Sequence, residues 1–431
     1  MSVSDFFDPI ITMSFSDTPL EVIEEIIDSL RDDSAALNAC SQTCQSLLPL
    51  CRKYIFQTVV LQPRSQEAKL RGLPRYVTLF GNLLDSNSQI ADYVQNLIYR
   101  METPDFEDES VPRILDKLHR IQYFQLSSGM KPCIDWSALR PNLRDSLSHI
   151  IHSATYLNIS CIEAFPINIF APCINLIHLS LAIIEADMDG YEHEYFVQDA
   201  VPQLQSLTAG VLSGEYTASL VDARRSNDVP VLDFSNLRSL DINIDDYSSL
   251  DACAALLEET EKLENLHCYG MYQSTFIYLP QPTLITLLVD FIKWRIDIPA
   301  LMNPSSFSTL KILRFALVVK DDIQDPLCGV CVDLTAFSGQ NIIEKIVLVV
   351  LVGIDCQCRT DNEWRKLDDV LATGFPRLSQ VTLCIDICVS SSDGIALQDK
   401  LNKLPEEQFP WLSKSSTVKF DFSVKIYTVS P

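Results

Sequence analysis

The clearest periodic pattern of apolar residues lies near the start of the chain. Apolar side chains recur there at spacings of one, three and four residues, at Val22, Ile23, Ile26, Ile27 and Leu30. Acidic residues fill the positions between them, so the pattern predicts an amphipathic helix with one apolar stripe. The segment Thr18-Pro19-Leu20-Glu21 predicts its start, with Thr18 as the cap, Pro19 in the first turn and Glu21 reaching back to the cap.

Two further short helices are predicted directly after this one. Asp32 and Asp33 interrupt the first helix, and Ser34 is predicted to cap the second. The second helix carries Leu37, Cys40, Cys44 and Leu47 at helical spacing, and a third element from about Leu50 carries Ile55 and Phe56. Three short helices in about 40 residues cannot bury all of these side chains against one another. We therefore expect apolar surface left over for a partner or for the next part of the chain.

The segment from Thr18 to Phe56 resembles the F-box, in the form common in fungi. The positions that match the F-box pattern are Pro19, Glu21, Val22, Ile23, Ile26, Ile27, Leu30, Leu37, Cys40, Cys44, Ile55 and Phe56. The chain departs from the pattern at Thr18, where a leucine is usual, and at Leu47, where a tryptophan is usual. The resemblance implies docking on the Skp-type linker protein of a cullin–RING ubiquitin ligase, with Leu20 and Leu47 among the contact residues.

A second pattern, Leu-x-x-Leu-x-aliphatic, returns irregularly through the rest of the chain. Well-formed copies are Leu237-Leu240-Ile242, Leu284-Leu287-Val289, Leu310-Leu313-Phe315, Ile343-Ile346-Leu348 and Leu378-Val381-Leu383. Weaker copies begin at Leu176, Leu204 and Leu263. The copies that begin at residues 204, 237, 263, 284, 310, 343 and 378 are 21 to 35 residues apart. These spacings are typical of leucine-rich repeats of about 20–29 residues with insertions.

The segments around the copies predict one strand and one helix for each. Helices are predicted over 76–84, 250–260 and 364–372, and strands over 93–98, 122–126, 156–159 and 418–422. This predicts an α/β fold, a degenerate leucine-rich-repeat solenoid with a parallel inner sheet and helices outside. The asparagine or cysteine that usually follows the strand in such repeats is mostly missing, so we expect an irregular solenoid. An ordinary α/β domain shares the leucine pattern, but its glycine-rich turns and single crevice fit poorly with only 12 glycines.

The residues between the leucines are expected on the inner face of the sheet, where they are free to specify a partner. The expected substrate face comprises Arg238, Asp241, Asn243, Thr286, Asp290, Lys311 and Arg314. Their chemistry follows no pattern that identifies a ligand. A solvated face is the simpler interpretation of each residue alone.

Charge and cysteine content narrow the classes of partner and the compartment. The chain carries 33 basic and 57 acidic residues, a formal net charge of −24. Such a surface repels a phosphate backbone, which argues against binding to nucleic acid. No run approaches the roughly 20 apolar residues of a membrane span, so no membrane partner is expected. The 14 cysteines, in a chain that starts without a secretory signal, are expected to be reduced thiols in the cytoplasm, the nucleus or both.

Motifs of nucleotide binding and of hydrolysis are missing from the sequence. We therefore predict no enzymatic activity and no catalytic, cofactor or metal site. Cys328, Cys331, Cys356 and Cys358 form two close pairs, but the spacing of the second pair is poor for zinc. No helix start is predicted after the first pair, which argues against a redox motif. These cysteines are interpreted as structural.

With the F-box resemblance, these patterns predict a tail over residues 1–15, an F-box-like helical module over 16–60 and the solenoid over 61–431. The function implied is a substrate-recognition adaptor of a Skp–cullin–F-box ubiquitin ligase. Its helical module would bind the linker protein of the cullin ligase core, and its repeats would bind a protein substrate of unknown identity. The alternative is a leucine-rich-repeat scaffold or interaction protein whose F-box-like segment only caps the solenoid.

Overall fold

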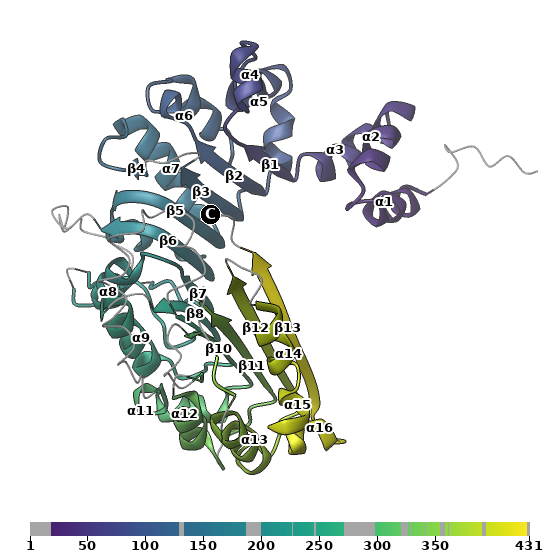
Figure 1. Cartoon of the computed structure of the whole chain (residues 1–431). Helices are drawn as coiled ribbons and strands as arrows, with labels where there is room; N and C mark the ends of the chain where they lie inside the picture. Colours follow the sequence, from purple (N-terminus) through teal and green to yellow (C-terminus); the bar gives the residue numbers. More distant parts are fainter. Residues whose placement is uncertain are drawn as a thin grey trace, which may run out of the picture. The chain divides into compact units, whose positions relative to one another are not determined.

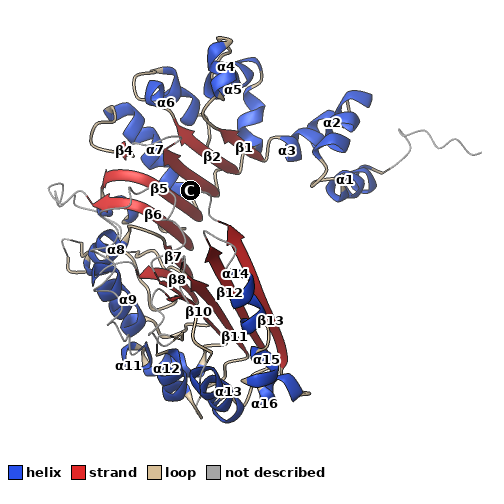
Figure 2. Ribbon diagram, viewed as in Figure 1, coloured by secondary structure: helices blue, strands red, loops and turns tan. Residues whose placement is uncertain are grey.

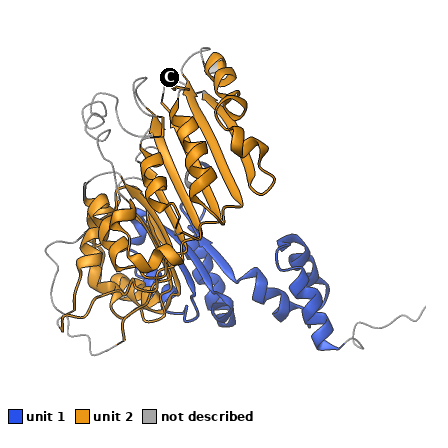
Figure 3. Cartoon of the chain, turned by 90° about the horizontal axis from the view of Figure 1, so that it is seen from below, with its two compact units in different colours: residues 1–124 blue, residues 125–431 orange. Residues whose placement is uncertain are grey.

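A computed structural model describes residues 19–128, 133–186, 200–225, 227–244, 247–270, 298–319, 326–327, 329–339, 341–353, 358–360, 362–389 and 394–428. The chain divides into two compact units, Met1–Phe124 and Gln125–Pro431, which Figure 3 colours separately. The expected tail over 1–15 and the predicted cap Thr18 lie outside the described residues.

The first unit begins with three short helices and continues into strands that pair in parallel. Its elements are α1 (Leu20–Ser29), α2 (Ser34–Thr43), α3 (Leu48–Ile55), β1 (Thr58–Leu61), α4 (Gln66–Leu70), α5 (Tyr76–Ser86), the 3₁₀ helix η2 (Ser88–Tyr93), β2 (Asn96–Met101), η3 (Thr103–Asp105) and α6 (Ser110–Leu115) (Figure 1). Strand β1 pairs with β2 from Thr58 opposite Asn96 to Leu61 opposite Tyr99. The boundary expected near residue 60 therefore falls within a strand.

The second unit is an α/β structure in which strand order follows chain order. Its strands are β3 (Tyr123–Ser128), which spans the unit boundary, β4 (Ile134–Asp135), β5 (Tyr156–Phe165), β6 (His178–Ala186), β7 (Ser206–Ala209), β8 (Ser239–Ile244), β9 (Asn265–Gly270), β10 (Ile312–Val319), β11 (Lys345–Val352), β12 (Gln380–Val389) and β13 (Lys419–Thr428). They are hydrogen-bonded in the order β3-β5-β6-β7-β8-β9-β10-β11-β12-β13, with β4 beside β5. From β5 to β13 every neighbouring pair is parallel. Among the described strands the order never reverses, so the crevice of a doubly wound sheet is not formed.

Most helices of the second unit follow one another along its strands, and the helix over Gly394–Leu401 lies beside β12 and β13 (Figure 2). They are α7 (Pro141–Ser153), η4 (Ile167–Phe170), α8 (Gly214–Asp222), α9 (Tyr247–Glu259), α11 (Ile298–Leu301), η7 (Pro304–Ser308), α12 (Val330–Phe337), α13 (Asn362–Gly374), α14 (Gly394–Leu401), α15 (Leu404–Glu407) and α16 (Pro410–Lys414). Helices that follow one another pack side by side, as α8 does with α9 and α12 with α13. A strand-helix unit thus packs mainly on the unit before and after it.

The copies of the leucine pattern lie in register across the sheet. In the copies that the structure describes, the second apolar position lies in one row across neighbouring strands: Leu179, Leu207, Leu240, Leu266, Leu313, Ile346 and Val381. All of these side chains are buried. Residues of a strand alternate between the two faces of its sheet, so this row defines one face, which we name the core face. The opposite face carries the half-buried residues between them, and we name it the open face.

Most elements predicted from the sequence are confirmed within a few residues. The helices predicted over 76–84, 250–260 and 364–372 are α5, α9 and α13, and the strands predicted over 122–126, 156–159 and 418–422 are β3, β5 and β13. The strand predicted over 93–98 begins later, at Asn96, because residues 88–93 form η2. The copy Leu284-Leu287-Val289 lies outside the described residues. Strand β1 was not predicted, and it precedes the first strand expected from the sequence.

The predicted helix caps of the first unit need correction. Pro19 is the N-cap of α1 rather than its first residue, since its carbonyl accepts from the Val22 and Ile23 amides at 3.1 and 3.2 Å. Asp33, not Ser34, caps α2, because its carboxylate accepts from the Ala36 amide at 2.9 Å. Helix α3 starts at Leu48, two residues before the expected Leu50, and Pro49 lies in its first turn, where no amide donor is needed.

The row of aliphatic side chains on the core face should dominate the stability of the second unit. We expect Leu266→Ala to lower the free energy of unfolding by about 2–5 kcal/mol, because it removes buried methyl groups and leaves a cavity. Asn265→Ala changes the adjacent, half-buried residue on the open face and should cost less than about 1 kcal/mol. Urea unfolding followed by circular dichroism measures both. Equal losses for the two variants would contradict the assignment of the faces.

Candidate functional site

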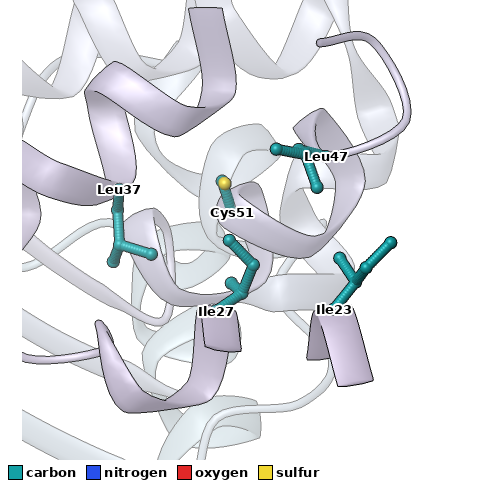
Figure 4. Packing of buried hydrophobic residues seen from close by; sticks show 5 residues of the cluster. All are labelled: Ile23, Ile27, Leu37, Leu47 and Cys51. Atoms are coloured by element: carbon teal, nitrogen blue, oxygen red, sulfur yellow. The ribbon is translucent and has the colours of Figure 1, made fainter. Parts of the chain in front are cut away.

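The three N-terminal helices enclose a hydrophobic core of their own. Its buried members are Ile23 and Ile27 from α1, Leu37 from α2, Cys51 from α3, and Leu47 at the N-cap of α3 (Figure 4). Partly buried residues pack around them: Leu30, Cys40, Cys44, Leu50, Tyr54 and Ile55. Every one of these residues lies between positions 23 and 55, so the helical module seals this core without help from α5.

A polar contact ties the first and third helices together. The Tyr54 hydroxyl donates to Asp28 Oδ1 at 2.9 Å. Partial burial, followed by this bond to the Asp28 carboxylate, raises the pKa of Tyr54 above its usual value. The contact fixes α1 against α3 and thereby sets which side of α1 faces outward.

Part of the apolar stripe of α1 remains on the surface. Leu20 is 59% exposed, Val22 43% and Ile26 47%, whereas Ile23 and Ile27 are 8% and 2% exposed. Val22 and Ile26 are one turn apart, so they form a row beside the buried row of Ile23 and Ile27. We name the exposed residues Leu20, Val22 and Ile26 the α1 apolar face, in which Val22 and Ile26 flank the buried row on one side and Leu20 flanks it on the other. Exposed aliphatic residues gathered on one short helix indicate an interaction surface.

The residues predicted to contact a linker protein thus fall into two groups. Ile23, Ile27, Leu37 and Leu47 are buried inside the module, and Leu30, Cys40, Cys44 and Ile55 pack around them. Pro19 and Glu21 are exposed together with the α1 apolar face, and Phe56 is half-buried. Only the exposed group offers side chains that a partner can cover without rearranging the module.

A second group of side chains gathers on the open face of the second unit. The register places Asp241 of β8 opposite His267 of β9, and His267 opposite Arg314 of β10. Asp241 Oδ2 lies 3.4 Å from His267 Nδ1, and it accepts from the Tyr269 hydroxyl at 3.4 Å. The Arg314 guanidinium lies over the Tyr269 ring, 5.8 Å from its centroid. We name Asp241, His267, Tyr269 and Arg314 the open-face cluster.

The cluster places charges of both signs close to one phenol. Partial burial and the nearby charge of Asp241 raise the pKa of Tyr269, while the Arg314 guanidinium opposes that change. Tyr269 therefore stays protonated and acts as a hydrogen-bond donor near neutral pH. The Arg314 Nε atom is buried and has no hydrogen-bond partner in the part of the chain that the structure describes.

A row of charged residues lies just before the strands. The Glu264 amide donates to the Arg238 carbonyl and the Lys311 amide to the Glu264 carbonyl, both at 2.8 Å, so the three residues are neighbours. The Glu264 carboxylate lies 3.5 Å from Arg238 Nη1 and 2.8 Å from Lys311 Nζ. The hydrogen bond from Lys311, with the charges of Lys311 and Arg238, lowers the pKa of Glu264. Two of the predicted substrate-face cations are therefore already paired.

The structure brings together only some of the residues predicted for a substrate face. Asp241 and Arg314 meet in the open-face cluster, and Asn243 is buried in the following position of the same face. Thr286 and Asp290 lie outside the described residues. Glu264, His267 and Tyr269 were missed, although the weaker copy that begins at Leu263 predicted a strand there. The residues between its leucines include Glu264, and His267 directly follows the second leucine, Leu266.

No group of three side chains able to hold a metal ion occurs among the described residues. Cys328 and Cys356 lie outside them, and Cys331 and Cys358 are buried. Helix α12 begins at Val330, contrary to the prediction that no helix starts after the first cysteine pair, so Cys331 lies in its first turn. Its thiol donates to the Glu363 carbonyl at 3.8 Å. None of the described helices has the length and apolar character needed to cross a membrane.

The pairing of Glu264 predicts a pH-dependent contribution to stability. Because its folded-state pKa is below the ordinary value of 4.5, the contribution is present above that pH and is lost as the pH falls through the folded-state value. We expect Glu264→Gln to be less stable than wild type by up to about 1 kcal/mol at neutral pH, and equally stable in strong acid. Glu261→Gln, at an exposed neighbour, serves as the control in urea unfolding at several pH values. A Glu264 difference that persists unchanged in acid would contradict the assignment.

Comparison with known proteins adds no assignment. No family model matches the sequence of this chain, and no curated protein matches it. The functional conclusions below therefore depend on the α1 apolar face and on the arrangement of the second unit.

Proposed function

We propose that this protein is a substrate-recognition adaptor of a Skp–cullin–F-box ubiquitin ligase. In this proposal the three N-terminal helices are an F-box that binds the Skp-type linker protein. The region that follows is an irregular leucine-rich-repeat solenoid that holds the protein to be ubiquitylated. The observation that carries the proposal is the α1 apolar face, which stays exposed although the module has a complete core.

The α1 apolar face has the chemistry that helix-in-groove binding requires. Such binding lays an apolar helix face into a groove of the partner, with residues one turn apart as anchors. Burying Leu20, Val22 and Ile26 contributes roughly 1.5–3 kcal/mol for each side chain. Ordering and association offset part of this gain, so Pro19 and Phe56 are expected to add contact area. The resemblance of the segment to the F-box names the class of partner.

The second unit supports the solenoid part of the proposal. Strand order that follows chain order, with one row of apolar residues from successive copies on the core face, is what stacked repeats produce. Leucine-rich repeats combine a strand with a helix in each unit. The copies described here differ in length and lack the usual asparagine ladder, which makes the array irregular. The open face is left free to bind a substrate.

An adaptor of this kind acts by proximity. It raises the effective concentration of a substrate lysine near the ubiquitin-conjugating enzyme and makes or breaks no bond itself. The two surfaces fit this division of labour because they lie on different elements, α1 and strands β8–β10.

The alternative is a scaffold protein in which the helical module only caps the repeats. It would require the apolar residues of α1 to be covered by the chain itself. Ile23 and Ile27 are covered, but by α2 and α3, and Leu20, Val22 and Ile26 remain exposed. This distribution favours the adaptor over the scaffold.

Co-precipitation with a Skp-type linker protein tests the proposal. We expect Val22→Asp and Ile26→Asp to reduce linker affinity by at least about tenfold, because each places a carboxylate in an apolar interface. Ile23→Asp and Ile27→Asp are unsuitable, since both side chains are buried in the module and their loss should unfold it. Ile395→Asp is the matched control, because Ile395 is a comparably exposed aliphatic residue, 61%, on α14.

Circular dichroism establishes that each variant is folded before the comparison is made. Recovery of the linker by folded Val22→Asp and Ile26→Asp at the level of wild type would exclude docking through α1. Loss of recovery with the Ile395→Asp control would show that the effect is not local to α1.

A further inference from the structure

Arg314 differs from three other cations near the open face, each of which lies beside a carboxylate. Arg238 and Lys311 are paired with Glu264, and Lys419 lies 2.8 Å from Asp421. Within the described residues no carboxylate forms an ion pair with Arg314, and its Nε atom is buried without an acceptor. Arg314 is half-buried, so its guanidinium has lost part of its hydration without gaining an acceptor or a counter-charge among the described residues. Binding of an anion would supply both.

The neighbours of Arg314 hold it in place without neutralising it. The Tyr269 ring stacks against the guanidinium, which limits its rotamers. The backbones of Asp241 and Arg314 are two strands apart, about 10 Å at the usual strand spacing of about 4.8 Å. The Asp241 carboxylate faces His267 and Tyr269. In the register His267 lies between Asp241 and Arg314, and its Nδ1 lies 3.4 Å from the Asp241 carboxylate.

The surface next to Arg314 is apolar. The open-face residues of β10 and β11 are Ile312, Ala316, Val318, Val347, Val349 and Leu351, apart from Arg314 and Lys345. All six are half-buried. On the neighbouring strands the same face carries polar residues, such as Asn265 of β9 and Thr382 of β12. Two cations, Arg314 and Lys345, thus border an apolar strip, and Arg314 has a buried nitrogen without an acceptor among the described residues.

We propose that Arg314 anchors an extended peptide segment of a partner protein, which places a carboxylate or phosphate on its guanidinium and apolar side chains on the strip of β10 and β11. The proposal rests on the substrate-holding role of the repeats and specifies the chemistry of that substrate. Arg314 supplies a planar fork that matches an oxyanion with two parallel hydrogen bonds. The contact with Asp241 orients the His267 ring, which borders the site.

The anion requirement follows from the charge of the site. A neutral peptide would leave the guanidinium desolvated and unpaired, and a basic peptide would be repelled by it. Carboxylate and phosphate share the oxyanion geometry that the fork recognises. They differ in charge and in the number of acceptor oxygens, which lets an experiment separate them.

Short synthetic peptides, tested against the purified full chain without ligase components, examine this inference. The probes carry a central phosphoserine, aspartate or serine, with flanking residues drawn from leucine, isoleucine, valine and glycine. Fluorescence polarisation measures binding. We expect peptides with a central anion to bind more tightly than their serine counterparts by about tenfold to a hundredfold, and Arg314→Gln to abolish that preference.

Two further variants make the result specific to the guanidinium. Arg314→Lys keeps the charge but loses the fork, so it should retain only part of the preference. Arg365→Gln removes an arginine of α13 that pairs with Asp369, and it should leave binding unchanged. Preference for phosphoserine over aspartate would identify phosphorylated partners, and equal binding would identify acidic ones. Either result supports the site.

Three results would overturn the inference: equal binding of peptides with phosphoserine, aspartate and serine at the centre, a preference for the central anion that remains in Arg314→Gln, or no binding of any probe. The linker co-precipitation separates this outcome from failure of the proposed function. Arg314→Gln should bind the linker as wild type does. Loss of linker binding by wild type with peptide binding intact would remove the docking role and leave the anion site standing.

Discussion

The parallel, in-register pairing of one aliphatic row is the constraint on which the second unit depends. Leu207, Leu240, Leu266 and Leu313 lie side by side on successive strands and are buried. A shift of any strand by one residue would turn its leucine to the open face and a polar residue into the core, so the register is strongly determined. Once it is set, the positions between the leucines are also set. The neighbourhood of Asp241, His267 and Arg314 is a consequence of how the leucines pack.

The helical module obeys a different constraint, which is its size. A unit of three short helices can enclose only a few side chains, and here Ile23, Ile27 and Leu37 fill most of that space. Val22 and Ile26 are as apolar as Ile23 but lie on the flank of α1 that neither α2 nor α3 covers. The apolar stripe of α1 therefore contains more side chains than the core of the helical module can bury. That excess supports the proposal of a partner for α1, in the same way that the uncompensated charge of Arg314 supports a ligand for the open face.

Local pattern predicted much of the fold and failed in identifiable places. The helices α5, α9 and α13 and the leucine-bearing strands followed from period and spacing, because their amphipathic or alternating patterns are long enough to be unambiguous. Strand β1, Thr58–Leu61, is only four residues long and lies where the sequence predicts the end of the helical module, so its pattern is too short to predict a strand. The cap of α2 was assigned one residue late, because Asp33 and Ser34 are both good caps and only the bond to the Ala36 amide distinguishes them.

The amino-acid sequence by itself determined the α/β class, the repeated strand positions and the surplus of apolar residues on α1, because each depends on spacing along one segment. Only the tertiary structure decided which distant residues meet. It pairs Glu264 with Arg238 and Lys311, and it places the Arg314 guanidinium over the Tyr269 ring. These residues are tens of positions apart, and no local pattern specifies which strands become neighbours. The tertiary structure also decided that Val22 is exposed and Ile23 is buried. Both lie on the apolar stripe of α1, and the packing of α2 and α3 determines which part of that stripe is covered.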